Sequence, residues 1–361
     1  MPMKVGIVGL PNAGKSSLFT AMTRVAAEAA NYPFTTIEPN VAIVPVPDER
    51  LDRVAECVGA SGVVHDSLEV HDIAGLVAGA HKGEGLGNKF LANIRETDAL
   101  LHVVRAHTDD NVIHPEGDVD PIRDLTTIET ELLLSDLEQA ERRIERVVRQ
   151  ARSGDRAAVA EHAWLEQVIA ALNDGKAART VPPPADAPNA LRDLSPLTSK
   201  PVLIVANLGE GEEGVPAAIA AHAAEQGAAA VALCVRLEAE LGALDEDEAE
   251  EMREELGAGE SGLGRVLRGA FGLLDLIAFF TAGEGKPAHS WHLKRGLSAW
   301  HAAGQIHSDI QQGFVRAEVI GCDVLLEAGG YAAARDKGQL RIEGRDYEIA
   351  DGDVISVRFT P

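Results

Sequence analysis

The chain of 361 residues carries a net charge of −24, from 33 Lys and Arg against 57 Asp and Glu, and 45% of its residues are hydrophobic. This length has room for about two or three domains with apolar cores. The acidic balance argues against a protein that coats nucleic acid through its overall field, because phosphate binding depends on clustered Lys and Arg. Such acidity is equally compatible with a plain solubility preference. We therefore expect no DNA partner, and any RNA contact must use a local basic face.

The sequence contains no signal for a membrane or for secretion, and this indicates the cellular compartment that we expect. There is no apolar run of about 18 residues and no basic leader followed by an apolar stretch, so we expect a cytoplasmic protein without a membrane partner. Cys57, Cys234 and Cys322 are far apart and form no C-x-x-C pair. They are expected to be reduced thiols rather than a disulfide or a zinc site.

A phosphate-binding loop is the first motif in the chain. Residues 9–16, GLPNAGKS, fit G-x-x-x-x-G-K-[ST] and lie between a strand-like run and a helix-forming one. In this motif Lys15 reaches the β- and γ-phosphates and the Ser16 hydroxyl holds Mg²⁺. A glycine-rich turn that only caps a helix would need neither the lysine nor the preceding strand. The nucleotide-binding residues expected here are Asn12, Ala13, Gly14, Lys15, Ser16 and Ser17.

Strand-like and helix-forming stretches alternate along much of the chain, which is the pattern of a doubly wound α/β sheet. In such sheets ligands collect at the carboxyl ends of the strands, where the phosphate loop lies. The expected strands are 5–8, 41–44, 68–71, 99–104, 202–206 and 229–235.

A long helical segment interrupts this pattern between Pro121 and Pro188. Apolar residues step by four and three along it, turn residues follow at 153–155, and the proline-rich stretch 181–188 ends it. We predict an antiparallel helical hairpin inserted into the nucleotide domain, followed by an exposed linker. The apolar seam comprises Leu133, Leu137, Ala140, Ile144, Val147 and Ala151 on the first helix, and Leu165, Val168, Ile169 and Leu172 on the second.

Five arginines cluster on the first of these helices. They either form a solvated face that pairs with Glu138, Glu141 and Glu145, or they dock a partner. The arginines are Arg142, Arg143, Arg146, Arg149 and Arg152.

After a helix-like run at 265–280, the sequence pattern becomes that of short strands separated by tight turns. Strands are expected at 290–293, 314–320, 340–342, 347–349 and 354–359, with a helix at 299–306. We therefore divide the chain into a nucleotide domain at 1–120 and 189–281, a helical insertion with its linker at 121–188, and a small α+β module at 282–361. The module offers a modest basic surface at His292, Lys294, Arg295 and His307.

Two further landmarks belong to a nucleotide-dependent switch. Asp72-Ile73-Ala74-Gly75 follows a strand, which places Asp72 to act on Mg²⁺ through water and Gly75 to offer its N–H to the γ-phosphate. Upstream, Thr36 lies 20 residues past Ser16 and would complete the Mg²⁺ shell when a γ-phosphate is present. Each landmark is weak alone, but their order and spacing behind a phosphate loop are specific.

Hydrolysis is expected to be slow or assisted. Small GTPases carry a water-orienting Gln where this chain has Leu76. Assistance could come from a partner, from K⁺ near the Asn12 carbonyl, or from another residue. His102 could position the water, although a histidine in an apolar strand is more often a satisfied core residue.

Base choice depends on Asn207-Leu208-Gly209-Glu210, at the place where guanine readers carry N-K-x-D. The Asp of that motif accepts hydrogen bonds from guanine N1–H and N2–H₂, whereas adenine presents an acceptor at N1. Leu208 and Glu210 remove this clamp, while Asn207 can still serve the base through its amide. Adenine becomes the favoured base, unless these residues are only an acidic loop without ligand contact.

These motifs resemble those of the Obg-like ATPase family, the YchF-type ribosome-associated ATPases. The matching segments are 9–17, 31–40 (NYPFTTIEPN), 72–80 (DIAGLVAGA), 83–91 (GEGLGNKFL), 93–98 (NIRETD), 207–210 and 345–354 (RDYEIADGDV), nearly end to end. The resemblance implies a P-loop NTPase domain with a coiled-coil-like hairpin and a C-terminal TGS domain of β-grasp fold. It also implies ATP preferred over GTP, Mg²⁺ held at Ser16 and Thr36, and binding to the ribosome or its large subunit.

The sequence thus predicts a slow Mg²⁺-dependent ATPase that works as a switch, with Lys15, Thr36 and Gly75 at the γ-phosphate. A GTPase of the same architecture, a ribosome-binding scaffold with a structural nucleotide and a metabolic kinase are the alternatives.

Overall fold

The computed structural model describes residues 3–28, 40–73, 86–109, 112–244, 246–256 and 261–360. The chain forms two compact units, each built from separate segments. Of the described residues, the first unit contains 3–28, 40–43 and those between 69 and 270, and the second contains 44–68 and 271–360. No helix within the described ranges has the length and apolarity that crossing a membrane requires.

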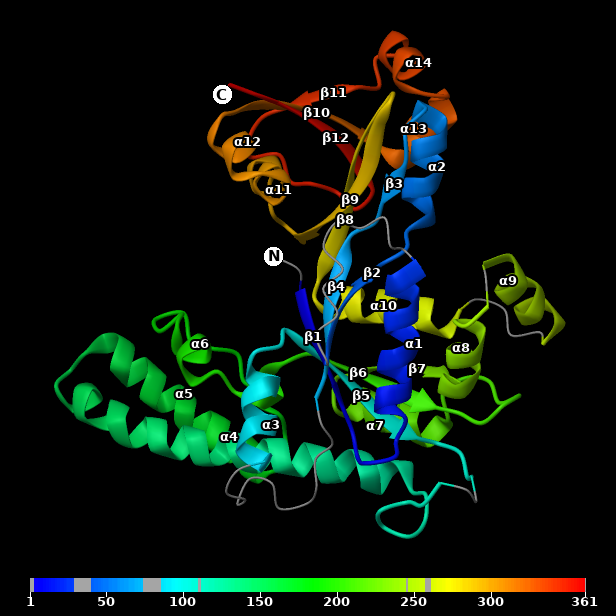
Figure 1. The fold of residues 1–361 in the computed structure, drawn as a ribbon. Coiled ribbons are helices and arrows are strands. Elements are labelled where there is room, and N and C mark those ends of the chain that lie inside the picture. The colour runs from blue at the N-terminus through cyan, green and yellow to red at the C-terminus, as the bar shows by residue number, and fades with distance from the viewer. Residues whose placement is uncertain are drawn as a thin grey trace. The chain divides into compact units, whose positions relative to one another are not determined.

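The first unit is built on a six-stranded sheet in the order β2-β4-β1-β5-β6-β7 (Figure 1). The pairs β1–β5, β5–β6 and β6–β7 are parallel, which confirms the predicted α/β pattern. One expected end is wrong, because β7 stops at Leu233 and Val235 already begins the next helix. The strands are β1 (Met3–Val8), β2 (Val41–Pro45), β4 (Ser67–Asp72), β5 (Ala99–Arg105), β6 (Val202–Asn207) and β7 (Ala229–Leu233).

Helices cover both faces of this sheet, as a doubly wound fold requires. Successive residues of β6 show it: Ile204 packs in one core with Leu125 and Ile219, whereas a Cβ on Gly269 would lie 2.9 Å from the Leu203 side chain. The helices of this unit outside the hairpin are α1 (Lys15–Glu28), α3 (Leu86–Arg95), α7 (Ala217–Glu225), α8 (Val235–Leu241), α9 (Glu246–Glu255) and α10 (Gly262–Leu273).

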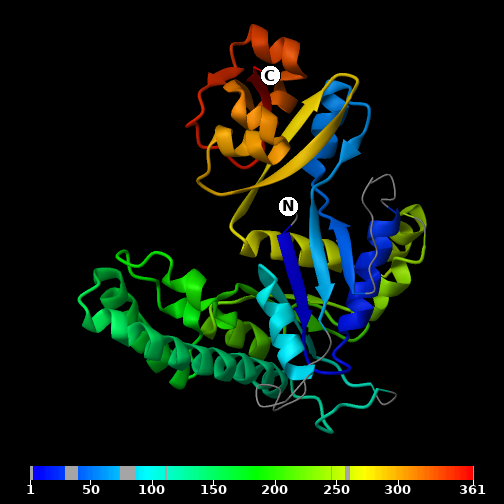
Figure 2. The same ribbon diagram turned by 60° about the vertical axis from the view of Figure 1, so that its left-hand side comes forward.

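The predicted hairpin is present as α4 (Pro121–Arg152) and α5 (Arg156–Asn173). Asp120 caps α4 through the N–H groups of Ile122 and Arg123, and Asp155 caps α5. The predicted apolar seam forms the core between the two helices. In both ribbon views the pair runs side by side and extends beyond the sheet (Figures 1 and 2). The chain returns through η2 (Ala178–Thr180), α6 (Ala190–Leu194) and η3 (Leu197–Ser199).

A buried carboxylate joins α4 to this return segment. Asp136 is fully buried and accepts hydrogen bonds from the Leu197 N–H, the Thr198 N–H and the Thr198 hydroxyl, each at 2.7 Å. Burial raises the pKa of Asp136 in spite of these bonds. Since each donor would be buried without another acceptor, this one side chain fixes how the hairpin leaves the sheet.

The second unit contains another six-stranded sheet, in the order β11-β10-β12-β8-β9-β3. Its strands are β3 (Val63–Val64), β8 (Leu276–Gly283), β9 (Lys286–Lys294), β10 (Phe314–Gly321), β11 (Arg341–Glu343) and β12 (Asp353–Phe359). Central β12 runs parallel to β8, and the β8–β9, β10–β12 and β10–β11 pairs are antiparallel. Its helices are α2 (Glu49–Val58), α11 (Ala299–Ile306), α12 (Ser308–Gln312), α13 (Cys322–Ala328) and α14 (Tyr331–Asp336).

Two apolar cores flank this second sheet. Phe279 packs with α11 on one face, and Phe280 packs with α2 and α13 on the other. Because α2 and β3 lie at 49–64, residues that the sequence assigned to the nucleotide domain contribute a helix and an edge strand here. Two hydrogen bonds attach the same segment: His292 Nδ1 to Asp66 Oδ2 at 2.6 Å, and the Asp66 N–H to Ser290 Oγ at 2.7 Å.

Two local predictions in this region are wrong. The helix expected at 265–280 ends at Leu273, because Asp275 has a left-handed backbone with φ of 53° and the apolar run after it forms β8. The strand expected at 347–349 is only a single bridge between Ser298 and Glu348. There the Tyr347 hydroxyl and the Ala350 N–H both donate to Asp353, which folds the segment into a turn.

Replacing Asp136 with Ala should destabilise the first unit by about 3 kcal/mol or more, because three buried donors lose their acceptor. Urea unfolding followed by the helical circular dichroism signal measures this. Glu138→Ala on the same helix removes an exposed carboxylate paired to Arg142 and should cost less than about 0.5 kcal/mol. Equal effects of the two substitutions would contradict the anchoring role of Asp136.

Candidate functional site

The phosphate loop follows β1 with a backbone that only particular residues can adopt. Gly9 has φ of 153°, and a Cβ there would lie 2.3 Å from the Val103 carbonyl oxygen of β5. Gly14 has φ of 104°, and a Cβ there would lie 2.5 Å from Asn207 Nδ2. Between them Asn12 also has a positive φ, of 62°. The loop is thus pressed against neighbouring strands, and both motif glycines are needed for this fit.

Lys15 is held at the centre of this loop. Its side chain is only 7% exposed, and Nζ donates a hydrogen bond to the Leu10 carbonyl oxygen at 2.8 Å. Burial lowers the pKa of Lys15, and the nearby charge of Asp72 partly opposes that shift. Helix α1 begins at Lys15, so its first N–H groups have no helical acceptor and face the loop. These features suit an anion, because the negative charge of a phosphate would compensate the positive charge of the buried Lys15 ammonium.

Ser16 and Asp72 meet at the same end of the sheet. Ser16 Oγ donates to Asp72 Oδ2 at 3.0 Å, and the buried Asp72 Oδ1 has no hydrogen-bond partner among the residues that the structure describes. A hydroxyl and a carboxylate with a free oxygen are hard ligands of the kind that Mg²⁺ takes beside phosphates and water. The donor set is therefore chemically compatible with the predicted Mg²⁺, which Ser16 and Asp72 would hold.

Asn207 connects the base-reading segment to the phosphate loop. At the end of β6, its Nδ2 donates to the Ala13 carbonyl oxygen at 3.1 Å, and its Oδ1 accepts from the Val235 N–H at 3.1 Å. The predicted base contact would therefore use the second hydrogen and the second lone pair of this amide. Leu208 is buried in the core beneath.

Glu210 does not face the pocket as a free carboxylate. Arg236 at the start of α8 donates to Glu210 Oε1 through Nε at 2.9 Å and through Nη2. Glu240 lies 3.7 Å from the same Nε. The sequence interpretation considered Glu210 alone and missed Arg236, because their pairing joins positions 26 residues apart across the β7–α8 turn.

A pocket of about 630 Å³ connects these elements. Such a volume suits a small-molecule ligand. It brings together the predicted residues Asn12, Gly14, Lys15, Ser16, Ser17, Asn207, Leu208 and Glu210, and adds Arg105, His107, Thr108, Asp109, Val112, Cys234, Val235, Arg236, Gly209 and Ala239.

Arg105 organises the wall of the pocket that the sequence interpretation missed. Its buried guanidinium donates to the carbonyl oxygens of His107, Asp109 and Val112 at 2.9 to 3.1 Å. Asn12 Nδ2 also donates to the Ile113 carbonyl oxygen at 2.9 Å, so this wall touches the phosphate loop. The only sequence signal was an arginine ending an apolar strand, which is a costly place for a charge without acceptors.

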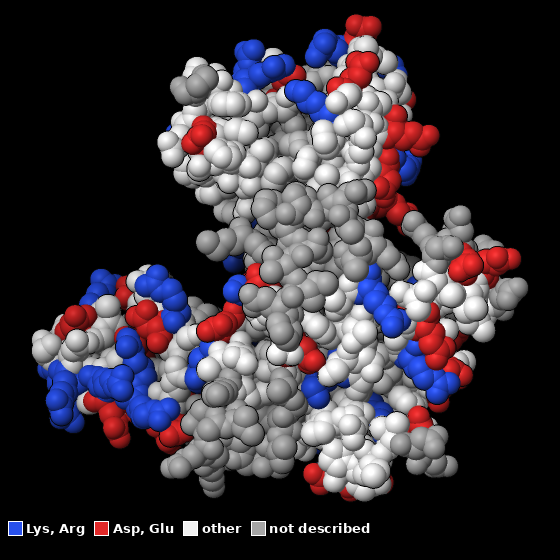
Figure 3. Space-filling model, viewed as in Figure 1, with Lys and Arg blue, Asp and Glu red and all other residues white. Residues whose placement is uncertain are grey.

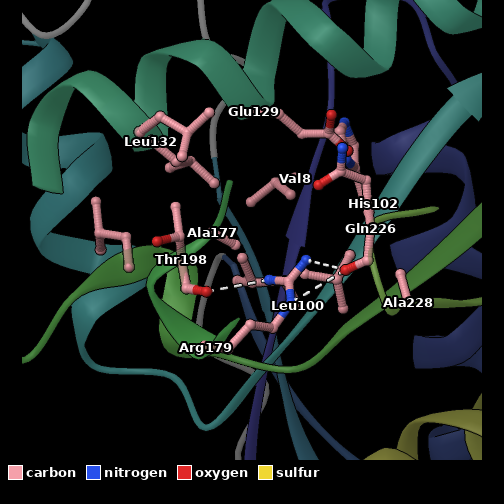
Figure 4. A pocket seen from close by; sticks show the side chains of 13 residues that line it. Val8, Leu100, His102, Glu129, Leu132, Ala177, Arg179, Thr198, Gln226 and Ala228 are labelled. Carbon is pink, nitrogen blue, oxygen red and sulfur yellow. Dashed lines mark hydrogen bonds between the residues drawn. The ribbon is translucent and has the colours of Figure 1, made fainter. Parts of the chain in front are cut away.

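Other predicted residues are not among the pocket residues. Thr36, Gly75 and Leu76 lie outside the described residues. His102 lines a separate cavity of about 40 Å³ with Glu129 and Arg179 (Figure 4). Arg179 there donates to the Thr198 and Gln226 carbonyl oxygens. His102 is 4% exposed, and burial, with the charges of His222 and Lys15, lowers its pKa to about 3.

A phosphate loop after β1, a carboxylate at the end of β4 and a base-reading segment that begins at the end of β6 define a P-loop nucleoside triphosphatase. In agreement, residues 4–147 match the family model MMR_HSR1, described as "50S ribosome-binding GTPase". Residues 276–360 match YchF-GTPase_C, described as "Protein of unknown function (DUF933)". The chain is 46% identical to "Ribosome-binding ATPase YchF" of Bacillus subtilis over 365 residues, covering 99% of this chain and all of that protein. It belongs to the YchF family.

Other matches agree. The Haemophilus influenzae "Ribosome-binding ATPase YchF" is 46% identical over 362 residues and 99% of both chains. The solved structure of the Schizosaccharomyces pombe YchF GTPase has a TM-score of 0.87 at 35% identity, covering 99% of this chain and 97% of that one. A GTP binding protein of Pyrococcus horikoshii shares the fold, with a TM-score of 0.64 at 20% identity over 99% of this chain and 100% of that chain.

The buried neutral His102 predicts a defined pH dependence of stability. Its folded pKa of about 3 lies below the unfolded value of 6.5, so its stabilising contribution is complete above pH 6.5 and is lost as the pH falls toward 3. Between pH 7 and pH 5 the unfolding free energy of the wild type should fall by about 2 kcal/mol more than that of His102→Leu. Urea unfolding at several pH values measures the difference. His162→Leu, on the hairpin surface, serves as the control and should parallel the wild type.

Proposed function

We propose that the protein is a slow Mg²⁺-dependent ATPase that acts as a conformational switch on the ribosome or its large subunit, in the cytoplasm. The observation that carries this proposal is the single pocket in which Lys15, Ser16 and Glu210 all lie. The bacterial relatives are named ribosome-binding ATPases, which supports both the nucleotide and the partner. We propose the roles expected from the sequence for these parts: nucleotide domain at 1–120 and 189–281, hairpin and linker at 121–188, TGS domain at 282–361. The packing adds residues 44–68 and 271–281 to the TGS side of this division.

The base is the open part of this proposal, because the comparisons name both ATPases and GTPases. Guanine recognition requires a carboxylate that accepts from N1–H and N2–H₂. The Glu210 carboxylate forms an ion pair with Arg236, in which Oε1 accepts hydrogen bonds from the guanidinium. Arg236 keeps further N–H donors at the pocket wall, where an acceptor such as adenine N1 is the better complement. Adenine is therefore the base we propose.

The metal role follows from the same geometry. Mg²⁺ would neutralise charge on the β- and γ-phosphates, which is its usual contribution to phosphoryl transfer. Ser16 would offer Oγ to the ion, and Asp72 would orient its water through the unpartnered Oδ1. Thr36 and Gly75 are proposed from the sequence pattern to sense the γ-phosphate. K⁺ beside the Asn12 carbonyl is proposed as the aid to hydrolysis in a chain with Leu76 in place of Gln.

The ATP preference should depend on the Glu210–Arg236 pair. Competition of ATP and GTP for one labelled nucleotide should show ATP at least about tenfold tighter, a difference of about 1.4 kcal/mol. Arg236→Ala frees the carboxylate and should shrink that ratio about threefold or more, because Glu210 can then accept from guanine. Glu240→Ala changes only the distant partner of Arg236 and should leave the ratio unaltered. GTP binding tenfold tighter than ATP in the wild type would sink the adenine assignment.

The Mg²⁺ requirement should depend on Ser16 and Asp72. Ser16→Ala and Asp72→Asn are expected to raise the Mg²⁺ concentration for half-maximal phosphate release by about 10- to 100-fold, as loss of ligand or orienting groups does. Ser17→Ala, at the next position, should keep the wild-type requirement. Phosphate release from ATP is measured with ribosomes and K⁺ present. Release no faster than that of Lys15→Ala would favour the scaffold with a structural nucleotide instead.

A further inference from the structure

The outer face of the hairpin carries a cluster of arginines, of which only some are paired with carboxylates. Arg142 pairs with Glu138 at 2.9 Å, and Arg143 pairs with Glu161 at 2.7 Å, as a solvated face would. Arg123, near the start of α4, pairs with Asp118 at 2.8 Å. The exposed side chains of the three arginines nearest the C-terminal end of α4 have no ion-pair partner among the described residues. These are Arg146, Arg149 and Arg152, which we call the arginine row.

The arginine row is set by the helix geometry. Its members follow at three-residue steps, so they lie along one side of α4 and span about 9 Å. Val147 of the apolar seam is buried against α5, and Arg149 lies two positions on, about 200° around the helix. Packing of the hairpin therefore turns the row outward. Figure 3 shows Lys and Arg side chains gathered over the hairpin.

Helix stability alone does not account for the row. Basic residues in a last turn complement the helix dipole by about 0.3 to 1 kcal/mol each, which applies to Arg149 and Arg152. Arg146 lies before that turn. The segment 146–152, RVVRQAR, contains no acidic residue, although acidic residues far outnumber basic ones in the chain.

Position matters as much as charge. The α4 helix is about 48 Å long, and Leu132 is its last residue in the core that covers the sheet. Arg149 follows 17 residues later, about 25 Å further along the helix. The Debye length at physiological salt is about 8 Å, so the acidic surface around the sheet is screened from a polyanion that approaches the row.

The C-terminal basic surface expected from the sequence is largely engaged. His292 is paired to Asp66, and Arg295 to Asp275. His307 Nδ1 accepts from the Asp309 N–H and so caps α12. Of these four side chains only that of Lys294 has no ion-pair partner among the described residues, so this expected surface offers fewer uncommitted charges than the arginine row.

We propose that the arginine row docks the hairpin onto ribosomal RNA through its phosphate groups. The inference rests on the proposed ribosome binding and names the surface that makes the contact. Guanidinium forks pair with phosphate oxygens in two parallel hydrogen bonds, which favours phosphates over a diffuse acidic field. Such contacts position the protein without reading sequence.

The test uses two full-length variants that each lose three positive charges. The first is Arg146→Gln, Arg149→Gln and Arg152→Gln together. The second, the control, is Arg142→Gln, Arg156→Gln and Arg192→Gln together, which removes arginines of the hairpin and of α6 that have carboxylate partners. Sedimentation with large ribosomal subunits and filter binding to protein-free large-subunit RNA are measured over a salt series, and basal ATP hydrolysis checks the fold.

The row variant should bind both targets about tenfold or more weakly, and its slope of log affinity against log salt should be shallower by about 2, since each lost phosphate contact removes about 0.7 to 0.9. The control should retain wild-type affinity. Equal losses in both variants would assign the effect to net charge and overturn the proposal, as would an unchanged row variant. Loss on subunits without any difference on the RNA would identify an acidic ribosomal protein as the partner. If the wild type fails to sediment with subunits, the proposed ribosome binding is wrong. Filter binding to the protein-free RNA then still decides whether the arginine row contacts RNA.

Discussion

The site depends on how closely the phosphate loop is packed against its own sheet. Gly9 fits beneath the Val103 carbonyl, and Gly14 fits against the Asn207 amide. That amide then fixes the loop, the base-reading segment and the start of α8 in one arrangement, through Ala13 and Val235. These contacts hold the described walls of the pocket in place within the protein itself, which lowers the ordering entropy that binding would cost. Two elements of this arrangement are costly: the buried Lys15 ammonium, hydrogen-bonded to a backbone carbonyl, and the buried Asp72 Oδ1, which has no partner among the described residues.

The sequence predicted those features that depend on residues close together in the chain. The phosphate loop, the strands around it and the hairpin seam all follow from spacing, and the meeting of Ser16 with Asp72 follows from strand ends at one sheet edge. The missed features join distant positions. Arg236 reaches Glu210 across a strand–helix turn, and Arg105 is satisfied by carbonyls of a loop with no sequence signature.

The helix expected at 265–280 is wrong for a related reason: the local sequence pattern does not contain the tertiary setting. An apolar run such as 276–280 satisfies a buried strand as well as a helix, and periodicity alone does not separate them. Asp275 decides the outcome through its left-handed backbone, a property of one residue in its tertiary setting. The hairpin was easier, because a strict seam over many turns leaves one solution. The same strictness turns the unpaired arginines away from the packed side.

The second unit is discontinuous in sequence, and this affects how the protein can be divided. The segment matched by the C-terminal family model begins at 276, yet Leu51 and Val54 of α2 fill the core beneath Phe280. A fragment that starts there would expose this apolar face to water and lose the edge strand β3. The C-terminal part therefore cannot be separated from the nucleotide-binding part by a cut at one position. A fragment that keeps the packing of this unit needs residues 44–68 as well as 271–360, which are joined only through the nucleotide-binding part of the chain.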